Sequence, residues 1–180
     1  MRRLLFLALI PLLLVSCIDY WANPISDIED AQVDEDLIGT WALGDKQPEV
    51  FFHILDEGKN WMRFVWTEKD DEPIQGRMYI SWLDGRTFLN IKLHDPCQEG
   101  FAGKYIIAEY EISPSGSLIF RMPQSNVLKK AVEDKILSAE TGEDGLTILS
   151  DSSEVRAFIR NAPQSELFSD FMEYRRLEDF

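Results

Sequence analysis

Few residues of this chain are of the types that carry out chemistry, and they form no recognisable catalytic set. The 2 histidines are His53 and His94. His94 and Cys97 lie in the run His-Asp-Pro-Cys, at a spacing where an imidazole and a thiolate could bind one metal ion. A zinc site needs three or four ligands, and no second pair follows. No serine lies in a Gly-x-Ser-x-Gly turn, and no glycine-rich phosphate loop occurs. We predict no catalytic residue, no metal and no cofactor, although distant residues could still assemble a Ser–His–Asp set.

Cys17 stands apart because of what precedes it. A basic start, Met1-Arg2-Arg3, leads into the apolar run Leu4–Val15 and then into Ser16. A basic start, an apolar middle and a small residue before the cut are typical of an export signal. The apolar run is shorter than the about 20 residues that a membrane-spanning helix needs. An ordinary secretory signal is the alternative, but such signals usually end in an Ala-x-Ala-like site.

The run Leu14-Val15-Ser16-Cys17 resembles the lipobox of bacterial lipoproteins. This resemblance implies that residues 1–16 are a signal peptide, that the Cys17 sulfur carries a diacylglycerol, and that the Cys17 amino group is acylated. The membrane is then a partner through this lipid. Each methylene group of the lipid that is buried in the bilayer contributes about 0.8 kcal/mol to membrane binding. In many Gram-negative lipoproteins an aspartate directly after the cysteine retains the protein in the inner membrane. Here Ile18 takes that place and Asp19 follows, so the resemblance implies the periplasmic face of the outer membrane.

The chain is strongly acidic, with 32 Asp+Glu against 18 Lys+Arg and a formal net charge of −14. Removal of the signal would make it more acidic, because that segment carries Arg2 and Arg3 and no acidic residue. Such a charge repels phosphate backbones, so we expect no nucleic acid partner. It is compatible with a cationic protein partner, although acidity can also serve solubility alone.

Composition divides the rest of the chain into a tether and a domain. Residues 17–36 are predicted to be a lipidated acidic tether, because the stretch 27–36 is dominated by Asp and Glu and is too polar to pack. Residues 37–180 are predicted to form one domain. If Cys17 is acylated, Cys97 has no partner for a disulfide within the chain, and we interpret it as a small buried side chain.

Period-2 alternation of apolar residues predicts a mainly β fold. We expect strands at Val50–Leu55, Trp61–Thr67, Arg77–Leu83, Thr87–Leu93, Tyr105–Ile112, Leu118–Met122, Leu146–Ser150 and Phe171–Leu177. The pair Asp84-Gly85 predicts a hairpin, and strands joined in this way are antiparallel neighbours. Two short helices, at 125–137 and 151–161, are expected to pack near the C-terminal part. The fold is thus an antiparallel meander or a barrel with two helices.

Gly39-Thr40-Trp41 resembles the Gly-x-Trp signature on the first strand of lipocalin-like barrels. The resemblance implies that Trp41 plugs one barrel end and that Arg175 or Arg176 packs over its ring. The stretch from about 145 to 177 is also similar to the end of small bacterial lipocalin-like lipoproteins. A plain core tryptophan in another sheet is the alternative for Trp41. The helix at 125–137 departs from a regular meander, so the barrel is either incomplete or covered at an open end by this helix.

These features favour a membrane-anchored, non-catalytic binding module for a small apolar ligand or an envelope partner. The alternative is an acidic protein–protein module, an inhibitor or assembly factor, that binds a cationic envelope protein. An enzyme is a third hypothesis with no motif behind it. Trp61, Trp66 and Trp82 are candidates for lining a cavity, but they equally suit a filled barrel, so we assign none of them to a ligand.

Overall fold

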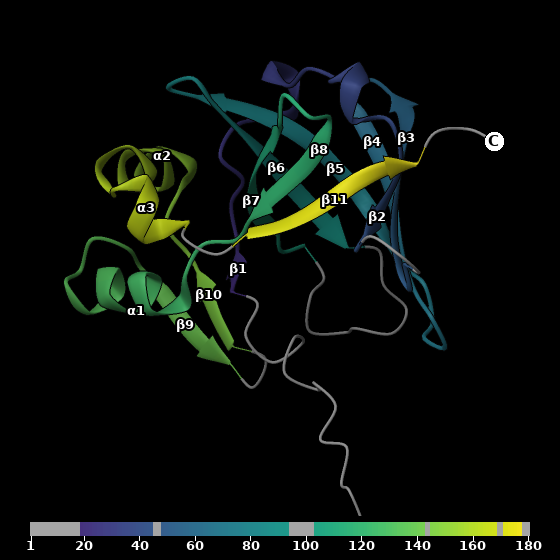
Figure 1. The fold of residues 1–180 in the computed structure, drawn as a ribbon. Coiled ribbons are helices and arrows are strands. Elements are labelled where there is room, and N and C mark those ends of the chain that lie inside the picture. Colours follow the sequence, from purple (N-terminus) through teal and green to yellow (C-terminus); the bar gives the residue numbers. More distant parts are fainter. Residues whose placement is uncertain (1–18, 45–47, 94–102, 143–144, 169–170, 178–180) are drawn as a thin grey trace, which may run out of the picture.

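The computed structural model describes residues 19–44, 48–93, 103–142, 145–168 and 171–177, and most of its strands close into one antiparallel barrel (Figure 1). The barrel strands are β2 (Gly39–Leu43), β3 (Val50–Gly58), β4 (Trp61–Glu68), β5 (Ile74–Leu83), β6 (Arg86–Leu93), β7 (Ile106–Ile112), β8 (Ser117–Arg121) and β11 (Phe171–Leu177). Closure comes from β11, which pairs with β8 on one side and β2 on the other. The predicted mainly β, antiparallel barrel is confirmed.

Alternation along each strand fills the barrel, because successive side chains point to opposite faces. On β5, for example, Met78 and Ile80 point inward and are buried. The hairpin predicted at Asp84-Gly85 joins β5 to β6, and both residues have positive φ, at 52° and 79°, as a type I′ turn requires. Alternation and turn chemistry therefore agree on the register.

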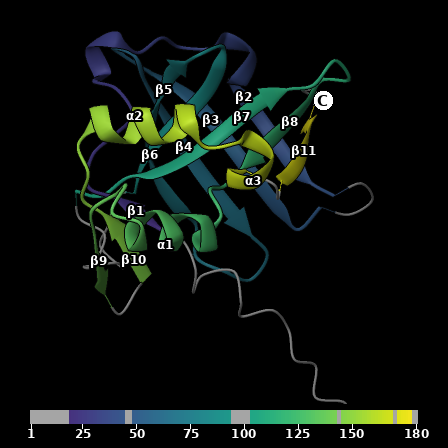
Figure 2. The same cartoon turned by 90° about the vertical axis from the view of Figure 1, so that its left-hand side faces the viewer.

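Residues 122–168 form an insert between β8 and β11 that packs on the outside of the barrel. Its elements are α1 (Ser125–Glu133), β9 (Ala139–Gly142), β10 (Gly145–Ile148), α2 (Ser152–Asn161) and α3 (Gln164–Leu167). Figure 2 shows α2 lying across the barrel strands. A second apolar core joins the insert to Leu83, Phe88 and Ile107 of the barrel. The first predicted helix therefore neither interrupts the barrel nor leaves it incomplete, and there are three α-helices in the described residues rather than two.

The acidic segment before the barrel is packed, so the prediction of a tether too polar to pack is wrong for the described residues from 19 onward. Its first residues form β1 (Tyr20–Trp21), which pairs with β10 in a three-stranded sheet. The 3₁₀ helices η1 (Ile28–Asp30) and η2 (Glu35–Leu37) follow. Trp21, Ile25 and Leu37 are each at most 1% exposed. The prediction failed because it was made from the average composition of the segment, which hides a few apolar residues. These residues are buried against the barrel, while most of the acidic residues between them face water.

A buried polar network fixes this segment to the barrel. The Asn90 Oδ1 accepts a hydrogen bond from the Ile25 backbone N–H at 2.8 Å, and its Nδ2 donates to Ser81 Oγ at 2.8 Å. The Ser81 hydroxyl lies 2.6 Å from that of Ser26, and Tyr79 Oη donates to the Ser26 carbonyl at 2.7 Å. Asn90 and Ser81 are almost fully buried, so each polar group depends on these partners.

Asn90→Ala is therefore expected to lower the free energy of unfolding by about 2 kcal/mol. The change removes the acceptor of the buried Ile25 N–H and the amide donor to Ser81 Oγ. Urea unfolding measures the loss, and hydrogen exchange should show faster opening at Ile25. Asn126→Ala, at an exposed position of α1, serves as the control and should be near neutral. Equal stability of Asn90→Ala and the parent protein would mean that this network does not hold the segment.

Candidate functional site

One end of the barrel is closed around Trp41. The indole Nε1 donates to the Leu37 carbonyl at 2.9 Å, and the Arg176 guanidinium lies 5.5 Å from the ring centroid. Arg176 Nη2 also donates to the Ile38 carbonyl at 2.6 Å. Of the two arginines that the resemblance put forward, Arg176 thus covers Trp41, whereas Arg175 donates to the Gly44 carbonyl.

Gly39 has no side chain, and this leaves room for the Arg176 guanidinium to lie over Trp41. A Cβ on Gly39 would lie 3.3 Å from Arg176 Nε, and its φ of 148° is one that other residues rarely adopt. The Gly-x-Trp pattern and the distant arginine therefore form one unit in space.

Arg176→Ala is expected to lower the free energy of unfolding by about 1 kcal/mol, because it removes the cation–π contact and a charged hydrogen bond. Arg175→Ala, at the neighbouring exposed position of β11, should cost less than about 0.5 kcal/mol. Thermal and urea unfolding of the two variants compare them directly. Equal losses would show that the Trp41 contact contributes nothing specific.

Aromatic side chains fill the middle of the barrel. The Phe52 ring lies 5.3 Å from Phe120, 5.5 Å from Phe64 and 6.3 Å from Tyr174, all between ring centroids. Trp66 packs against the same ring at 6.2 Å. Contacts at these distances are those of a packed core, so the interior is occupied by the chain itself.

The three tryptophans considered for a cavity do not converge. Trp66 belongs to the barrel core, but Trp61 lies on the outer face, where its ring is 5.1 Å from that of Tyr79 and beneath the guanidinium of Arg77. Trp82 is 58% exposed near the β5–β6 hairpin. A shared aromatic pocket built from these residues is therefore wrong.

Buried tyrosines make stability sensitive to high pH. Burial raises the pKa of Tyr79, Tyr110 and Tyr174 above the ordinary value near 10. The neutral phenol is then favoured by folding, so this contribution is complete below about pH 10 and is lost as the pH rises further. Urea unfolding across this range should show falling stability above pH 10, with the absorbance of these three tyrosinates appearing only as the protein unfolds. Full ionisation at the ordinary pKa in a protein that stays folded would contradict this.

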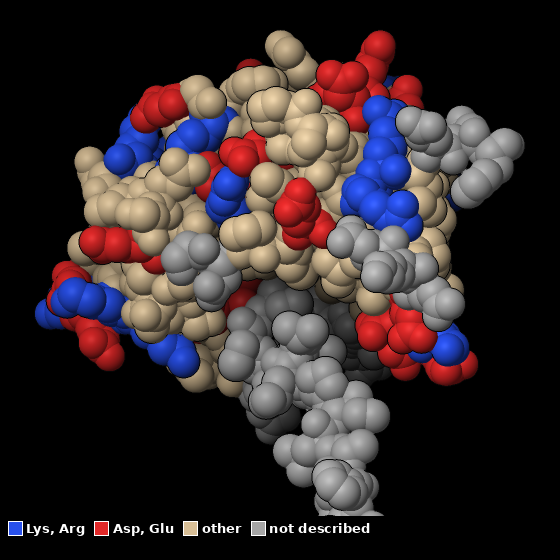
Figure 3. Space-filling model, in the orientation of Figure 1, with Lys and Arg blue, Asp and Glu red and all other residues tan. Residues whose placement is uncertain are grey.

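Acidic side chains gather at the end of the barrel that η1 and η2 cover. We call residues 27–36 the acidic end, and Figure 3 shows acidic side chains at the top of the molecule, most clearly around the place of η2. Its exposed members are Asp27, Glu29, Asp30, Glu35 and Asp36. Asp34 is the exception, because its Oδ2 accepts from Tyr110 Oη at 2.9 Å and its Oδ1 from the Asp36 N–H at 3.0 Å.

The acidic end and the start of the described chain lie toward opposite ends of β7. Trp21 and Tyr105 exchange two backbone hydrogen bonds just before β7 begins, whereas Asp34 binds Tyr110 near its other end. Tyr105 and Tyr110 are separated by roughly 17 Å of extended chain, at about 3.3 Å per residue. The protein therefore has one end where its chain begins and another that carries a concentration of negative charge.

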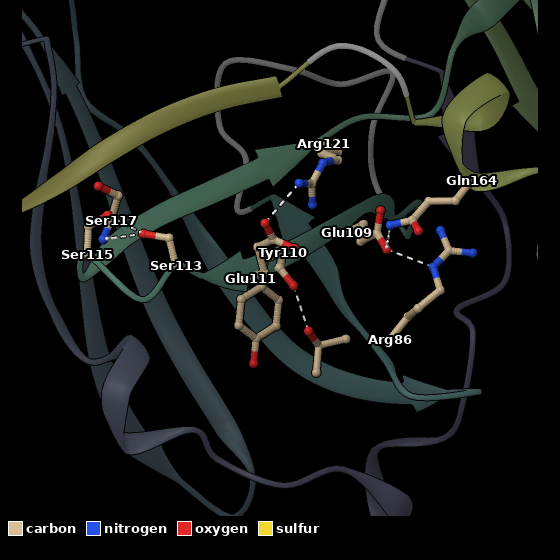
Figure 4. A network of polar contacts seen from close by, with 10 residues as sticks. Arg86, Glu109, Tyr110, Glu111, Ser113, Ser115, Ser117, Arg121 and Gln164 are labelled. Atoms are coloured by element: carbon tan, nitrogen blue, oxygen red, sulfur yellow. Dashed lines mark hydrogen bonds and ion pairs between the residues drawn. The ribbon is translucent and has the colours of Figure 1, made fainter.

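A buried ionic cluster joins the barrel to the insert (Figure 4). Glu109 on β7 is 3% exposed, and its Oε1 accepts from Arg86 Nε at 2.7 Å and from Gln164 Nε2 of α3 at 2.8 Å. The Arg86 guanidinium lies about 5 Å from the ring centroids of both Phe88 and Phe168. The cluster therefore holds α3 against the barrel.

Next to this cluster, Arg121 pairs with Glu111 at 2.9 Å on the outer face, and that hydrogen bond lowers the pKa of the Glu111 carboxyl. Arg86 Nη2, Glu109 Oε2 and Arg121 Nη1 have no hydrogen-bond partner within the described part of the chain. Neither pair contains a nucleophile beside a base, so we assign the charges a structural role.

Two surface depressions lie outside the barrel interior. One, of about 430 Å³, is lined by Pro48, Glu49, Phe51, Thr67, Glu68 and Lys69. The other, of about 360 Å³, is lined by Ile136, Glu154, Ala157, Phe158, Asn161 and Ala162. Neither lining contains a histidine or cysteine.

Of the residues that could do chemistry, only His53 lies within the described part of the chain. His53 lies on β3, where its Nδ1 is 3.0 Å from Thr40 Oγ1 and its ring stacks on Phe51. His94, Cys97 and Cys17 fall outside the described residues. Among the residues that are described, no cluster of three or more His, Cys, Asp or Glu could hold a metal ion.

The helices of the structure and three comparisons with known proteins bear on function. None of the helices within the described ranges combines the length and apolar character needed to span a membrane. Searches against protein-family models, curated proteins and solved structures found no match. Function must therefore be inferred from the chain's own residues and geometry.

Sequence inspection missed Asn90 and Glu109 as anchoring residues. Both carried a signal, since each is a polar residue inside an otherwise apolar strand, Phe88–Ile91 and Ile106–Tyr110. A polar side chain in such a position needs a buried partner. The identity of the partner, Ile25 in one case and Gln164 in the other, depends on how distant segments fold back.

Proposed function

We propose that this protein is an envelope lipoprotein of the outer membrane whose barrel is a non-catalytic module that binds a cationic protein partner. In this proposal residues 1–16 are the signal peptide and Cys17 carries the lipid. The barrel is lipocalin-like, which the contact of Arg176 with Trp41 beside Gly39 supports.

The observation that carries the choice of partner is the filled barrel. A small apolar ligand would occupy the interior, where Phe52, Phe120 and Tyr174 are already in ring contact. Binding is therefore assigned to the outer surface. The acidic end places five exposed carboxylates on that surface. Complementary charge favours both the encounter with a cationic protein and the choice of that partner.

A charge-neutralised variant tests this assignment. The lipidated full-length protein is used to capture partners from solubilised envelopes at low and high salt. We expect a cationic protein to be captured at low salt and released at high salt, because exposed charges are screened. The test variant combines Glu29→Gln, Asp30→Asn, Glu35→Gln and Asp36→Asn, and it should lose the captured protein.

The matched control removes the same charge elsewhere, at exposed positions of the insert and β11. It combines Glu133→Gln, Glu140→Gln, Glu166→Gln and Glu173→Gln, and it should retain the partner. Capture that is equal in both variants would contradict binding at the acidic end. Native mass spectrometry of the protein from its own host supplies the other test, since a stoichiometric small apolar molecule would favour the ligand function instead.

A further inference from the structure

The described chain begins almost at the proposed site of lipidation. Only Ile18 separates Cys17 from Asp19, whose Oδ2 accepts a hydrogen bond from Ser125 Oγ at 2.6 Å. Tyr20 and Trp21 are then buried in β1 at 6% and 1% exposure. Because an extended chain spans about 3.5 Å per residue, the Cys17 Cα lies at most about 7 Å from that of Asp19. A lipid on Cys17 would therefore bring the folded domain itself to the bilayer surface.

Lysines and tyrosines surround this starting point. The Lys104 Nζ lies 5.8 Å from the centroid of the Tyr20 ring, and the Lys92 Nζ lies 5.4 Å from that of Tyr105. Tyr105 is next to β1, since its backbone is bonded to that of Trp21. We call Tyr20, Lys92, Lys104, Tyr105 and the N-terminal turns of α1 the anchor-proximal face.

Helix α1 adds a further cation to this face. It begins at Ser125, the partner of Asp19, and the exposed Lys129 lies one turn later on the same side of the helix. Figures 1 and 2 agree in placing α1, β1, β9 and β10 at the end of the molecule away from η1 and η2. Lysine therefore lies near the start of the chain, whereas η1 and η2, which carry most of the acidic end, lie toward the other end of the molecule. Asp27 is the nearest acidic residue of that end, since its charge acts on Tyr105.

We propose that the anchor-proximal face rests on the phospholipid headgroups, with Lys92, Lys104 and Lys129 facing lipid phosphates. This inference rests on the proposed lipid anchor and adds the orientation of the domain. Lysine attracts anionic lipid, and tyrosine, here the partly exposed Tyr105, is favoured at the membrane–water interface. The strongly acidic domain would otherwise be repelled by an anionic surface, so its orientation directs the acidic end away from the membrane.

Hydrogen exchange on vesicles tests the contact. The lipidated protein is placed in vesicles of phosphatidylethanolamine and phosphatidylglycerol and compared with a variant that carries a Gly/Ser spacer between Ile18 and Asp19. A spacer of about twenty residues spans roughly 25 Å and lets the domain leave the surface while the lipid and the fold stay unchanged. We expect exchange at residues 103–105 and 125–130 to be roughly five-fold slower in the native chain than in the spacer variant, as contact with lipid restricts opening. Residues 27–36 should exchange equally in both.

Charge reversal gives a second test with the native linker. The combination Lys92→Glu, Lys104→Glu and Lys129→Glu should lose the slower exchange, whereas Lys59→Glu in the distal β3–β4 turn should keep it. Thermal unfolding of each variant in detergent establishes that the fold is intact.

The outcomes separate the two proposals. Equal exchange in the native and spacer chains, both bound to vesicles, would overturn the contact and leave the anchor in place. If the protein from its host proves to carry no lipid and does not associate with vesicles, the anchor and the contact are both overturned. Slower exchange that persists in the triple lysine variant would contradict the assignment of the lysines to lipid phosphate.

Discussion

Phe52→Ala is expected to lower the free energy of unfolding by about 4 kcal/mol, because a large buried ring is removed from a core that cannot collapse around it. Phe52 is 4% exposed and contacts the rings of Phe64, Phe120 and Tyr174. Urea unfolding of the variant measures the loss. The effect also tests the functional choice, since a filled barrel leaves binding to the outer surface.

Phe51→Ala is the matched control for that variant. Phe51 is the preceding residue on β3, and its side chain points to the outer face, where it stacks on His53. We expect a loss of about 1 kcal/mol from this change, as for a ring that is only partly buried. Similar losses for the two phenylalanines would show that the barrel interior is loosely packed, and the small apolar ligand would become the better hypothesis.

Gly76→Ala is the second change with a large expected effect, about 3 kcal/mol of lost stability, because the added methyl group meets backbone rather than a movable side chain. A Cβ at this position on β5 would collide with the Lys92 carbonyl oxygen and would lie 2.7 Å from Phe64 Cε1. The neighbouring strand β6 cannot move away without breaking its pairing with β5. Thermal unfolding of the variant gives the measurement.

Gly142→Ala at the end of β9 provides the comparison. Its Cβ would meet nothing closer than the Gly145 carbonyl oxygen at 4.0 Å, so the change should be nearly neutral. If Gly76→Ala is equally neutral, the close approach of β5 and β6 at this point is wrong.

Local patterns predicted most of the barrel. Alternation located the middle strands, and Asp84-Gly85 fixed a hairpin because few residue pairs accept positive φ in succession. Closure through β11 could not be read in this way, since its pairing with β2 joins residues far apart in the chain. The Gly39–Trp41 signature with a distant arginine was the one long-range clue, and it led to Arg176.

The N-terminal segment shows where composition misleads. Residues 27–36 are rich in acidic side chains, yet Ala31 and the adjacent Leu37 are buried against the barrel. A few apolar residues suffice to order a segment when an existing surface receives them. This correction has a functional consequence, because a packed segment places the barrel near the proposed lipid, where a flexible tether would have let it move away.

The two proposed roles, contact with lipid and binding of a protein partner, lie at different ends of the molecule. At one end the chain emerges beside Lys104 and Tyr20, suited to a lipid surface. At the other, Glu35 and Asp36 are exposed beyond the Trp41 plug, suited to a cationic protein. The barrel between them is a rigid spacer, since its core is closed by side chains.

The intact mass of the protein extracted from its host membrane tests the central claim most directly. The account predicts a chain that begins at Cys17 and carries the added mass of a diacylglycerol and an amide-linked acyl group, and it predicts that Cys17→Ser protein leaves the membrane fraction. A mature chain that begins at another residue, or an unmodified Cys17 in a protein that stays equally membrane-bound, would contradict it.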